Sequence, residues 1–290
     1  MAEVAQMELV PASLVAQQTP VLQSENRLCY AIFADTHITA EELEPIVQAV
    51  PNAIAAALTR HAYYFVPLTI GETEETMVAP GYTIDLGDRA MCHRNVQFDG
   101  ADCIFISTRL MQDRFALAFE FFINVAHHFV EAAGVPQSFC DLAWSQAVAD
   151  VRGETSQDSY ENRRRALDRS RSESPGARMA ERTFSRLESR LDSRPDSRLD
   201  SRVDQATPGR GMEKGRVDEK AKSSFFESAF SDGLAIYMLS LTLDFNYTDL
   251  REREYPLLAA PALAERLRHV AALFPPNPGY DFQISYRHKF

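Results

Sequence analysis

The chain has 290 residues with 41 acidic and 30 basic side chains, and its hydrophobic fraction of 45% is ordinary for a protein that buries a substantial core. Its 4 cysteines form no CxxC pair, so the sequence indicates neither a zinc ribbon nor a dense disulfide framework. No basic region followed by an apolar run opens the chain, and no segment approaches about 18 uninterrupted apolar residues. We therefore expect no standard secretion signal, no membrane span and a cytoplasmic location.

Charge is distributed unevenly along the chain. Residues 160–224 carry 17 Lys or Arg and 12 Asp or Glu, a net charge of +5, whereas the remaining residues carry a net charge of −16. An acidic body repels a phosphate backbone, so we expect no nucleic-acid binding by the folded part. We expect the Arg/Ser-rich stretch to contact a protein partner.

The first half of the chain alternates short apolar segments with one helical pattern. Residues 1–24 show no clear period and are expected to form a flexible tail, with order beginning near residue 27. Thr39 is a predicted N-cap, followed by acidic residues, for a helix that runs to residue 58 and is interrupted at Pro51. Apolar runs predict strands at 28–34, 62–70 and 101–107, with an irregular hairpin between the last two.

The segment Asp113–Ala133 (DRFALAFEFFINVAHHFVEAA) predicts a helix that is apolar nearly all round, capped by Asp113 and ended by Gly134. Four polar side chains recur along it at spacings of four, three and four, which places them on one face: Glu120, Asn124, His127 and Glu131. Burying such groups is costly unless they are hydrogen-bonded or bind a metal. The stripe is therefore either a structural hydrogen-bond ladder or a catalytic or ligand-binding site, and both interpretations stay open.

The composition changes after residue 153. The stretch SRLESRLDSRPDSRLDSRVD repeats a four-residue unit and has no apolar face large enough to pack, so residues 154–222 are predicted to be a disordered insertion. A docking segment or a serine-phosphorylated switch are its functional alternatives. Helical patterns return at 225–243 and 261–273, and Phe282–Tyr286 (FQISY) predicts a final edge strand.

These elements predict an α+β fold in which a small mixed sheet covers one side of a core of two apolar helices. Residues 25–153 and 223–290 are expected to form one domain, split by the insertion. Cys92-His93 and His61 are expected to be incidental or structural, and no P-loop, dinucleotide fingerprint or nucleophile elbow occurs in the sequence.

Two passages resemble the core of zincin metallopeptidases. The run Cys103–Ser107 followed by Glu120–Ala132 is similar to their edge strand and active-site helix, and Glu227-Ser-Ala-Phe-Ser-Asp-Gly-Leu-Ala235 is similar to the second helix of the gluzincin branch. In this alignment His127 matches the second histidine of H-E-x-x-H and Glu227 matches a ligand position. Ile123 and Asn124 stand at the first histidine and at the general-base glutamate, and neither residue type performs that chemistry.

The resemblance implies a zincin-like scaffold without the standard zinc peptidase centre, acting as a binding or scaffolding protein and needing no cofactor. The alternative is a metal-dependent hydrolase or oxidase that uses a non-standard ligand set for one zinc, iron or manganese ion. Its candidate metal ligands are His127, Glu131, Glu227 and Asp232, with Glu120 a further candidate.

Overall fold

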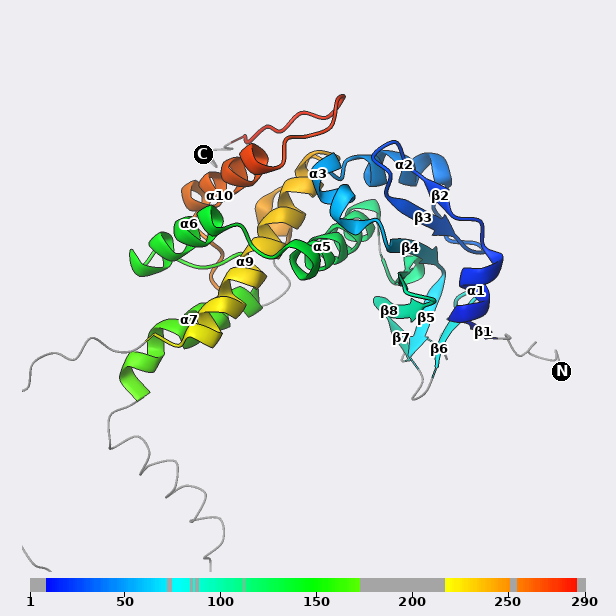
Figure 1. The fold of residues 1–290 in the computed structure, drawn as a ribbon, viewed down its shortest axis with the longest axis horizontal. Coiled ribbons are helices and arrows are strands. Elements are labelled where there is room, and N and C mark those ends of the chain that lie inside the picture. The colour runs from blue at the N-terminus through cyan, green and yellow to red at the C-terminus, as the bar shows by residue number, and fades with distance from the viewer. Residues whose placement is uncertain are drawn as a thin grey trace, which may run out of the picture.

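The computed structural model describes residues 9–71, 75–83, 86, 89–111, 113–172, 217–250 and 255–285. The named strands lie in the N-terminal half of the chain together with the short helices α1, α2 and α3, and the C-terminal half is helical, with the long helix α5 (Arg114–Ala133) between the two (Figure 1). The predicted α+β class is confirmed. No helix of the described residues is long and apolar enough to cross a membrane.

The central sheet has five strands, and its three middle strands are parallel. Both edge strands run antiparallel to their neighbours. In spatial order the strands are β2 (Leu22–Gln23), β3 (Cys29–Ile32), β4 (His61–Val66), β9 (Ala101–Ser107) and β8 (His93–Phe98). The middle strands are apolar runs, as expected where both faces of a sheet are covered.

Alternation along β4 and β9 sends side chains into two different cores. Tyr63 and Phe65 belong to the large core that contains α5, whereas Tyr64 and Val66 belong to a second core with Ala12 and Val15 of helix α1 (Ala12–Gln18). The prediction that residues 1–24 form a flexible tail is therefore wrong for the described part. Strand β1 (Val10–Pro11) pairs with β6 (Thr76–Ala79), and β2 pairs with β3, so long-range pairing orders a segment without its own periodicity.

Proline divides one predicted strand into two. The run 62–70 forms β4 and β5 (Leu68–Gly71), which belong to different sheets, because Pro67 has no N–H to donate to a ladder. The smaller sheet has the order β1-β6-β5-β7, where β7 is Ala90–Met91. It lies on the side of the central sheet opposite to α5. The central sheet therefore packs on the helical core with one face, as predicted, whereas its other face packs on α1 and the smaller sheet, which the sequence did not predict.

Helix ends follow the local chemistry of the sequence. Thr39 and Glu42 form a capping box on α2 (Ala40–Gln48), and the chain breaks at Pro51 before α3 (Asn52–Ala55). Asp113 caps α5 by accepting a hydrogen bond from Ala116 N, and Gly134 ends the helix at a φ of 73°. The remaining helices are α6 (Gln137–Val148), α7 (Gln157–Ser172), α9 (Glu219–Ser240) and α10 (Ala260–Leu273).

The predicted insertion is shorter than its sequence character indicates. Residues 154–172 and 217–222 are described and folded: Glu154 is fully buried, and α7 lies along α9 (Figure 1). Only residues 173–216 of the predicted insertion lie outside the described residues. Buried hydrogen bonds of Arg163 with Glu154 and with the backbone carbonyls of Val151 and Gly153 help to hold α7 in place. The predicted final strand is also wrong for Phe282–Ser285, which forms no ladder within the described residues.

Candidate functional site

The polar stripe of α5 divides between two environments. Asn124 is 2% exposed and Glu120 is mostly buried, both facing the sheet, whereas His127 and Glu131 are exposed to solvent. The expectation of one continuous buried stripe is therefore wrong. The imidazole that enters the protein is that of the next residue, His128, which is 4% exposed.

Glu120 holds one end of a polar seam between α5 and strand β8. Its Oε1 lies 2.6 Å from Nδ1 of His93 and also accepts a hydrogen bond of 3.2 Å from the amide of Asn124. The same amide donates to the backbone carbonyl of Glu120 at 2.8 Å. The carboxylate thus fixes the orientation of the His93 imidazole, which is the role a carboxylate plays beside a histidine acid or base. His93, expected to be incidental, is part of the site.

His128 forms the centre of the seam. Its Nε2 lies 3.0 Å from the amide nitrogen of Asn95, and its Nδ1 lies 3.3 Å from the hydroxyl of Tyr63. The His61 ring is next to it, with 5.0 Å between ring centroids. Burial, followed by the electrostatic effect of His61, lowers the pKa of His128 to about 4, so its imidazole is neutral at pH 7.

The third group of contacts closes the seam at the far end of β8. Gln97 donates to Asp102 at 2.8 Å, and Asp102 lies 3.8 Å from Nε2 of His61. Burial nevertheless lowers the pKa of His61, because desolvation outweighs the favourable effect of Asp102. His93, Asn95 and Gln97 thus lie on one face of β8, where His93 and Asn95 contact α5 and Gln97 bonds Asp102 of β9. That i, i+2, i+4 pattern is visible in the sequence and indicates a strand with one polar face.

A groove of about 460 Å³ lies on the other side of His127, bounded by α5, α7 and α9. His127, Glu131 and Glu227 all line it, so the structure brings these three candidate ligands to one concave surface. Asp232 does not join them, because its carboxylate accepts a hydrogen bond of 2.8 Å from Thr155, and burial raises its pKa to about 6. Within the described ranges, no three His, Cys, Asp or Glu side chains are placed to hold a metal ion together.

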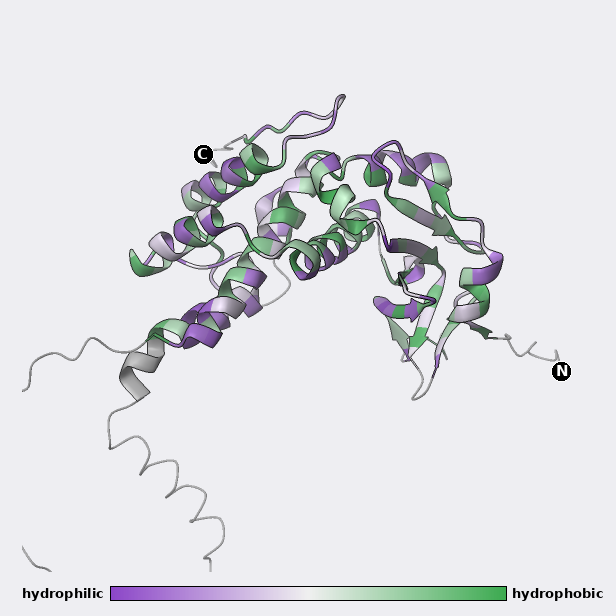
Figure 2. Ribbon diagram, in the orientation of Figure 1, coloured by the Kyte–Doolittle hydropathy of each residue, from purple (hydrophilic) through white to green (hydrophobic). Residues whose placement is uncertain are grey.

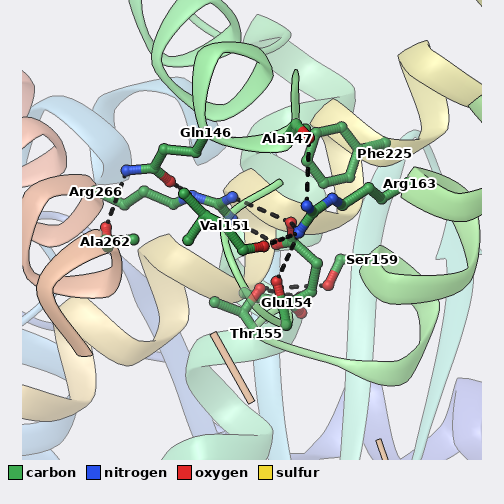
Figure 3. Close-up of polar contacts among 12 residues, drawn as sticks. Gln146, Ala147, Val151, Glu154, Thr155, Ser159, Arg163, Phe225, Ala262 and Arg266 are labelled. Atoms are coloured by element: carbon green, nitrogen blue, oxygen red, sulfur yellow. Dashed lines mark hydrogen bonds and ion pairs between the residues drawn. The ribbon is translucent and has the colours of Figure 1, made fainter. Parts of the chain in front are cut away.

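A buried ion network connects α7, which carries part of that groove, to α10 (Figure 3). Glu154 accepts hydrogen bonds from Arg266 at 2.7 Å and 3.3 Å and from Arg163 of α7 at 3.2 Å. Gln146 accepts from Arg266 at 2.8 Å, which satisfies a further N–H of this fully buried guanidinium. The preceding Gly153 has a φ of 77° and lies against the backbone of residue 257, where a Cβ would collide with the carbonyl. These contacts join the loop of Gly153 and Glu154 to α7 and α10.

No protein-family model, no curated protein and no solved structure matches this chain.

Proposed function

We propose that the chain is a metallopeptidase-like binding domain that lacks a peptidase centre and holds an extended segment of a partner protein. The proposal combines the resemblance of α5 and α9 to the zincin helix pair with the residues that occupy its catalytic positions. Ile123 has no metal-binding atom, and Asn124 has an amide in place of the general-base carboxylate. The two remaining matches, His127 and Glu227, are too few for a zinc site.

The observation that carries the proposal is the state of Glu120 and Asn124. The carboxylate of Glu120, which faces the sheet, is already bonded to His93 and to Asn124. The Asn124 amide is in turn bonded to the helix backbone. A water molecule would have to break these bonds to be activated here. This arrangement supports a structural role for the seam, in which it attaches β8 to α5.

The free edge of β8 is the proposed binding element. In the described chain β8 pairs only with β9, and Ser107 N donates to the carbonyl of Cys92. Because hydrogen-bonded and non-bonded pairs alternate in an antiparallel ladder, the N–H and C=O groups of His93, Asn95 and Gln97 point to the open edge. An unpaired edge of this kind accepts an extended peptide as an additional strand.

The experiment compares two substitutions at Gln97. Gln97→Pro removes an outward N–H without removing a ladder bond to β9, whereas Gln97→Thr keeps the N–H and loses the same side chain. Linear peptides selected from a random displayed library on the full-length wild-type protein are the probes. We expect them to bind wild type and Gln97→Thr, to bind Gln97→Pro about tenfold more weakly, and to be recovered uncleaved by mass spectrometry. Circular dichroism and thermal unfolding check that both variants are folded.

Two results would reject this proposal. Cleavage of the bound peptides by the purified protein would show a peptidase. Equal binding by both Gln97 variants would remove the β8 edge from the interface.

A metal-dependent hydrolase or oxidase is the second candidate, favoured by the common position of His127, Glu131 and Glu227 on the groove. Elemental analysis of the purified protein and of His127→Ala tests it. Stoichiometric zinc, iron or manganese that disappears in the variant would support this candidate. Metal-free protein whose unfolding temperature does not change on adding these ions would reject it.

A further inference from the structure

A pocket of about 470 Å³ opens at the carboxyl end of the parallel strands of the central sheet. One side is formed by residues 36–38, which follow β3, and another by Thr108 and Arg109, which directly follow β9. The first turns of α2 and α5 complete it. This pocket shares no lining residue with the groove between α5, α7 and α9, and none of its lining residues belongs to β8.

The chain leaves the three parallel strands in different directions. After β3 it enters α2, whose Leu43 and Ile46 belong to the same core as α5, and after β9 it enters α5 itself. After β4 it enters β5 of the smaller sheet, on the opposite side of the central sheet. Neighbouring parallel strands whose connections diverge in this way leave a crevice beyond their carboxyl ends, and open parallel sheets bind their ligands in such crevices.

The loop after β3 has a strained backbone that a side chain from the end of β9 holds. Ala34 and His37 have φ values of 58° and 59°, in the left-handed region that residues with a Cβ seldom adopt. Nε and Nη2 of Arg109 donate to the backbone carbonyl of Asp35 at 3.1 Å and 2.8 Å, and Nη2 lies 2.6 Å from the Asp35 carboxylate. Strained conformations that the surroundings must hold in this way cluster at binding and active sites.

Two arginines keep hydrogen-bond donors available to the pocket. The contacts with Asp35 use Nε and Nη2 of Arg109, and its Nη1 has no partner among the described residues. The Arg109 side chain is only 14% exposed, so its guanidinium is held in one place before a ligand binds. Arg114 is exposed, and Nη2 of its guanidinium makes a single long contact of 3.5 Å with the backbone carbonyl of Glu42.

The two carboxylates of the pocket are each used in a helix cap. Glu42 accepts hydrogen bonds from the backbone N–H and the hydroxyl of Thr39 at 2.9 Å and 3.1 Å, and Asp113 accepts one from Ala116 N at 2.9 Å. The positive ends of α2 and α5 offset part of their charge. The remaining charge limits how much negative charge a ligand can bring, so a singly charged carboxylate suits the pocket better than a phosphate group with nearly two charges.

We propose that this pocket binds a small organic monocarboxylate. The guanidinium groups of Arg109 and Arg114 bind its two oxygens, since a planar set of N–H donors matches the geometry of a carboxylate. Its apolar body contacts Ile38 and Met111, which line the pocket, and the ring of Tyr82, which is 48% exposed. On one side of the pocket, α2 carries hydrophilic residues next to hydrophobic ones (Figure 2). The inference does not depend on strand pairing at β8.

The test uses ligand-observed NMR on the full-length protein. The probes are a set of aliphatic and aromatic monocarboxylates that includes benzoate, each paired with its primary amide, which has the same shape and no charge. Arg114→Gln removes one set of donors from the pocket. The matched control is Arg268→Gln, because Arg268 is an exposed arginine of α10 outside the pocket and its loss changes the net charge equally. Arg109→Lys is a second pocket variant, which keeps the charge but loses the planar donors.

We expect carboxylates of the set to bind with a Kd of about 1 mM or below and their amides to bind at least about tenfold more weakly. Arg114→Gln and Arg109→Lys should each weaken carboxylate binding about tenfold, and Arg268→Gln less than about twofold. Thermal unfolding checks that all three variants are folded.

Three results would overturn the proposal. If no carboxylate bound more tightly than its amide, the pocket would not recognise the charged group. Equal weakening in Arg114→Gln and Arg268→Gln would show that net charge explains binding. Tighter binding of phenyl phosphate than of benzoate would show a phosphate site instead. These outcomes leave the Gln97 comparison unaffected, so this proposal and the one for the β8 edge fail separately.

Discussion

Replacing Glu154 by glutamine is expected to lower the free energy of unfolding by about 3 to 5 kcal/mol. Glu154 is 0% exposed, and its two oxygens accept three hydrogen bonds from Arg163 and Arg266, which are themselves 6% and 0% exposed. Glutamine keeps the shape but presents an NH₂ group to one side. At least one arginine N–H then faces a donor, and two buried positive charges lose their counter-charge.

The measurement is urea unfolding followed by the fluorescence of Trp144, the single tryptophan, and by circular dichroism. Glu161→Gln is the matched control. Glu161 also pairs with an arginine, Arg165 at 3.1 Å, but both side chains are solvent-accessible at 43% and 66%, so its loss should cost less than about 1 kcal/mol. If the two variants were destabilised equally, the conclusion that the buried network fixes α7 would be refuted.

Three further outcomes are expected. Acidification from pH 6.5 to pH 4 should remove up to about 3 kcal/mol of stability through His128, because burial lowers its folded-state pKa to about 4 while the unfolded chain binds the proton near 6.5. In His128→Gln the free energy of unfolding, measured in urea, should fall less steeply over this pH range. An equally steep fall in the variant would contradict the role of His128. Deleting residues 154–222 should abolish cooperative unfolding in calorimetry, because it removes α7 and Glu154; an unchanged transition would show that they do not support the fold. Gly153→Ala should lower the free energy of unfolding in urea by about 1 to 3 kcal/mol, because φ at this position is 77° and a Cβ would collide with the backbone of Pro256 and Leu257. An unchanged free energy of unfolding would mean that the loop can shift.

The features that the sequence predicted correctly are decided by a few adjacent residues. The capping box of Thr39 and Glu42, the interruption at Pro51, and the Asp113 and Gly134 ends of α5 all depend on chemistry within one helical turn. The errors come from contacts between residues far apart in sequence. Strand β1 is ordered by pairing with β6, in which Val10 lies opposite Val78 and Pro11 opposite Met77, and no local pattern contains that information.

The insertion boundary was misplaced for a related reason. Absence of an apolar face is a sound argument against packing only if hydrophobic burial is the main source of stability. Helix α7 instead contributes Arg163, whose guanidinium donates to the carbonyls of Val151 and Gly153 as well as to Glu154. The sequence around Arg163 resembles the low-complexity stretch that follows it. Only the buried partners of Arg163 distinguish it from the arginines of that stretch.

The sequence predicts polar side chains along α5, but it does not separate those that face the sheet from those that face solvent. Adjacent histidines on a helix differ by about 100°, so either His127 or His128 can complete the polar stripe within the spread of a periodic pattern. Packing decides between them: Tyr63 and Asn95 bond His128, and His127 faces the groove. The partners on β8, His93 and Asn95, belong to a pattern of alternating polar residues. From the sequence alone, this pattern is equally typical of a strand with one face exposed to solvent.

The two sides of α5 have different physical roles. On the sheet side, the bonds of Glu120 and His128 hold β8 in place and leave its outer backbone groups available. On the groove side, His127, Glu131 and Glu227 lie on one concave surface next to α7, whose position depends on the Glu154 network. Loss of that network should therefore leave peptide binding at the β8 edge intact in a variant that stays folded, because the hydrogen bonds of Glu154 go to Arg163 and Arg266 and not to β8. A folded Glu154→Gln variant that no longer binds the selected peptides would show that the β8 edge depends on the network.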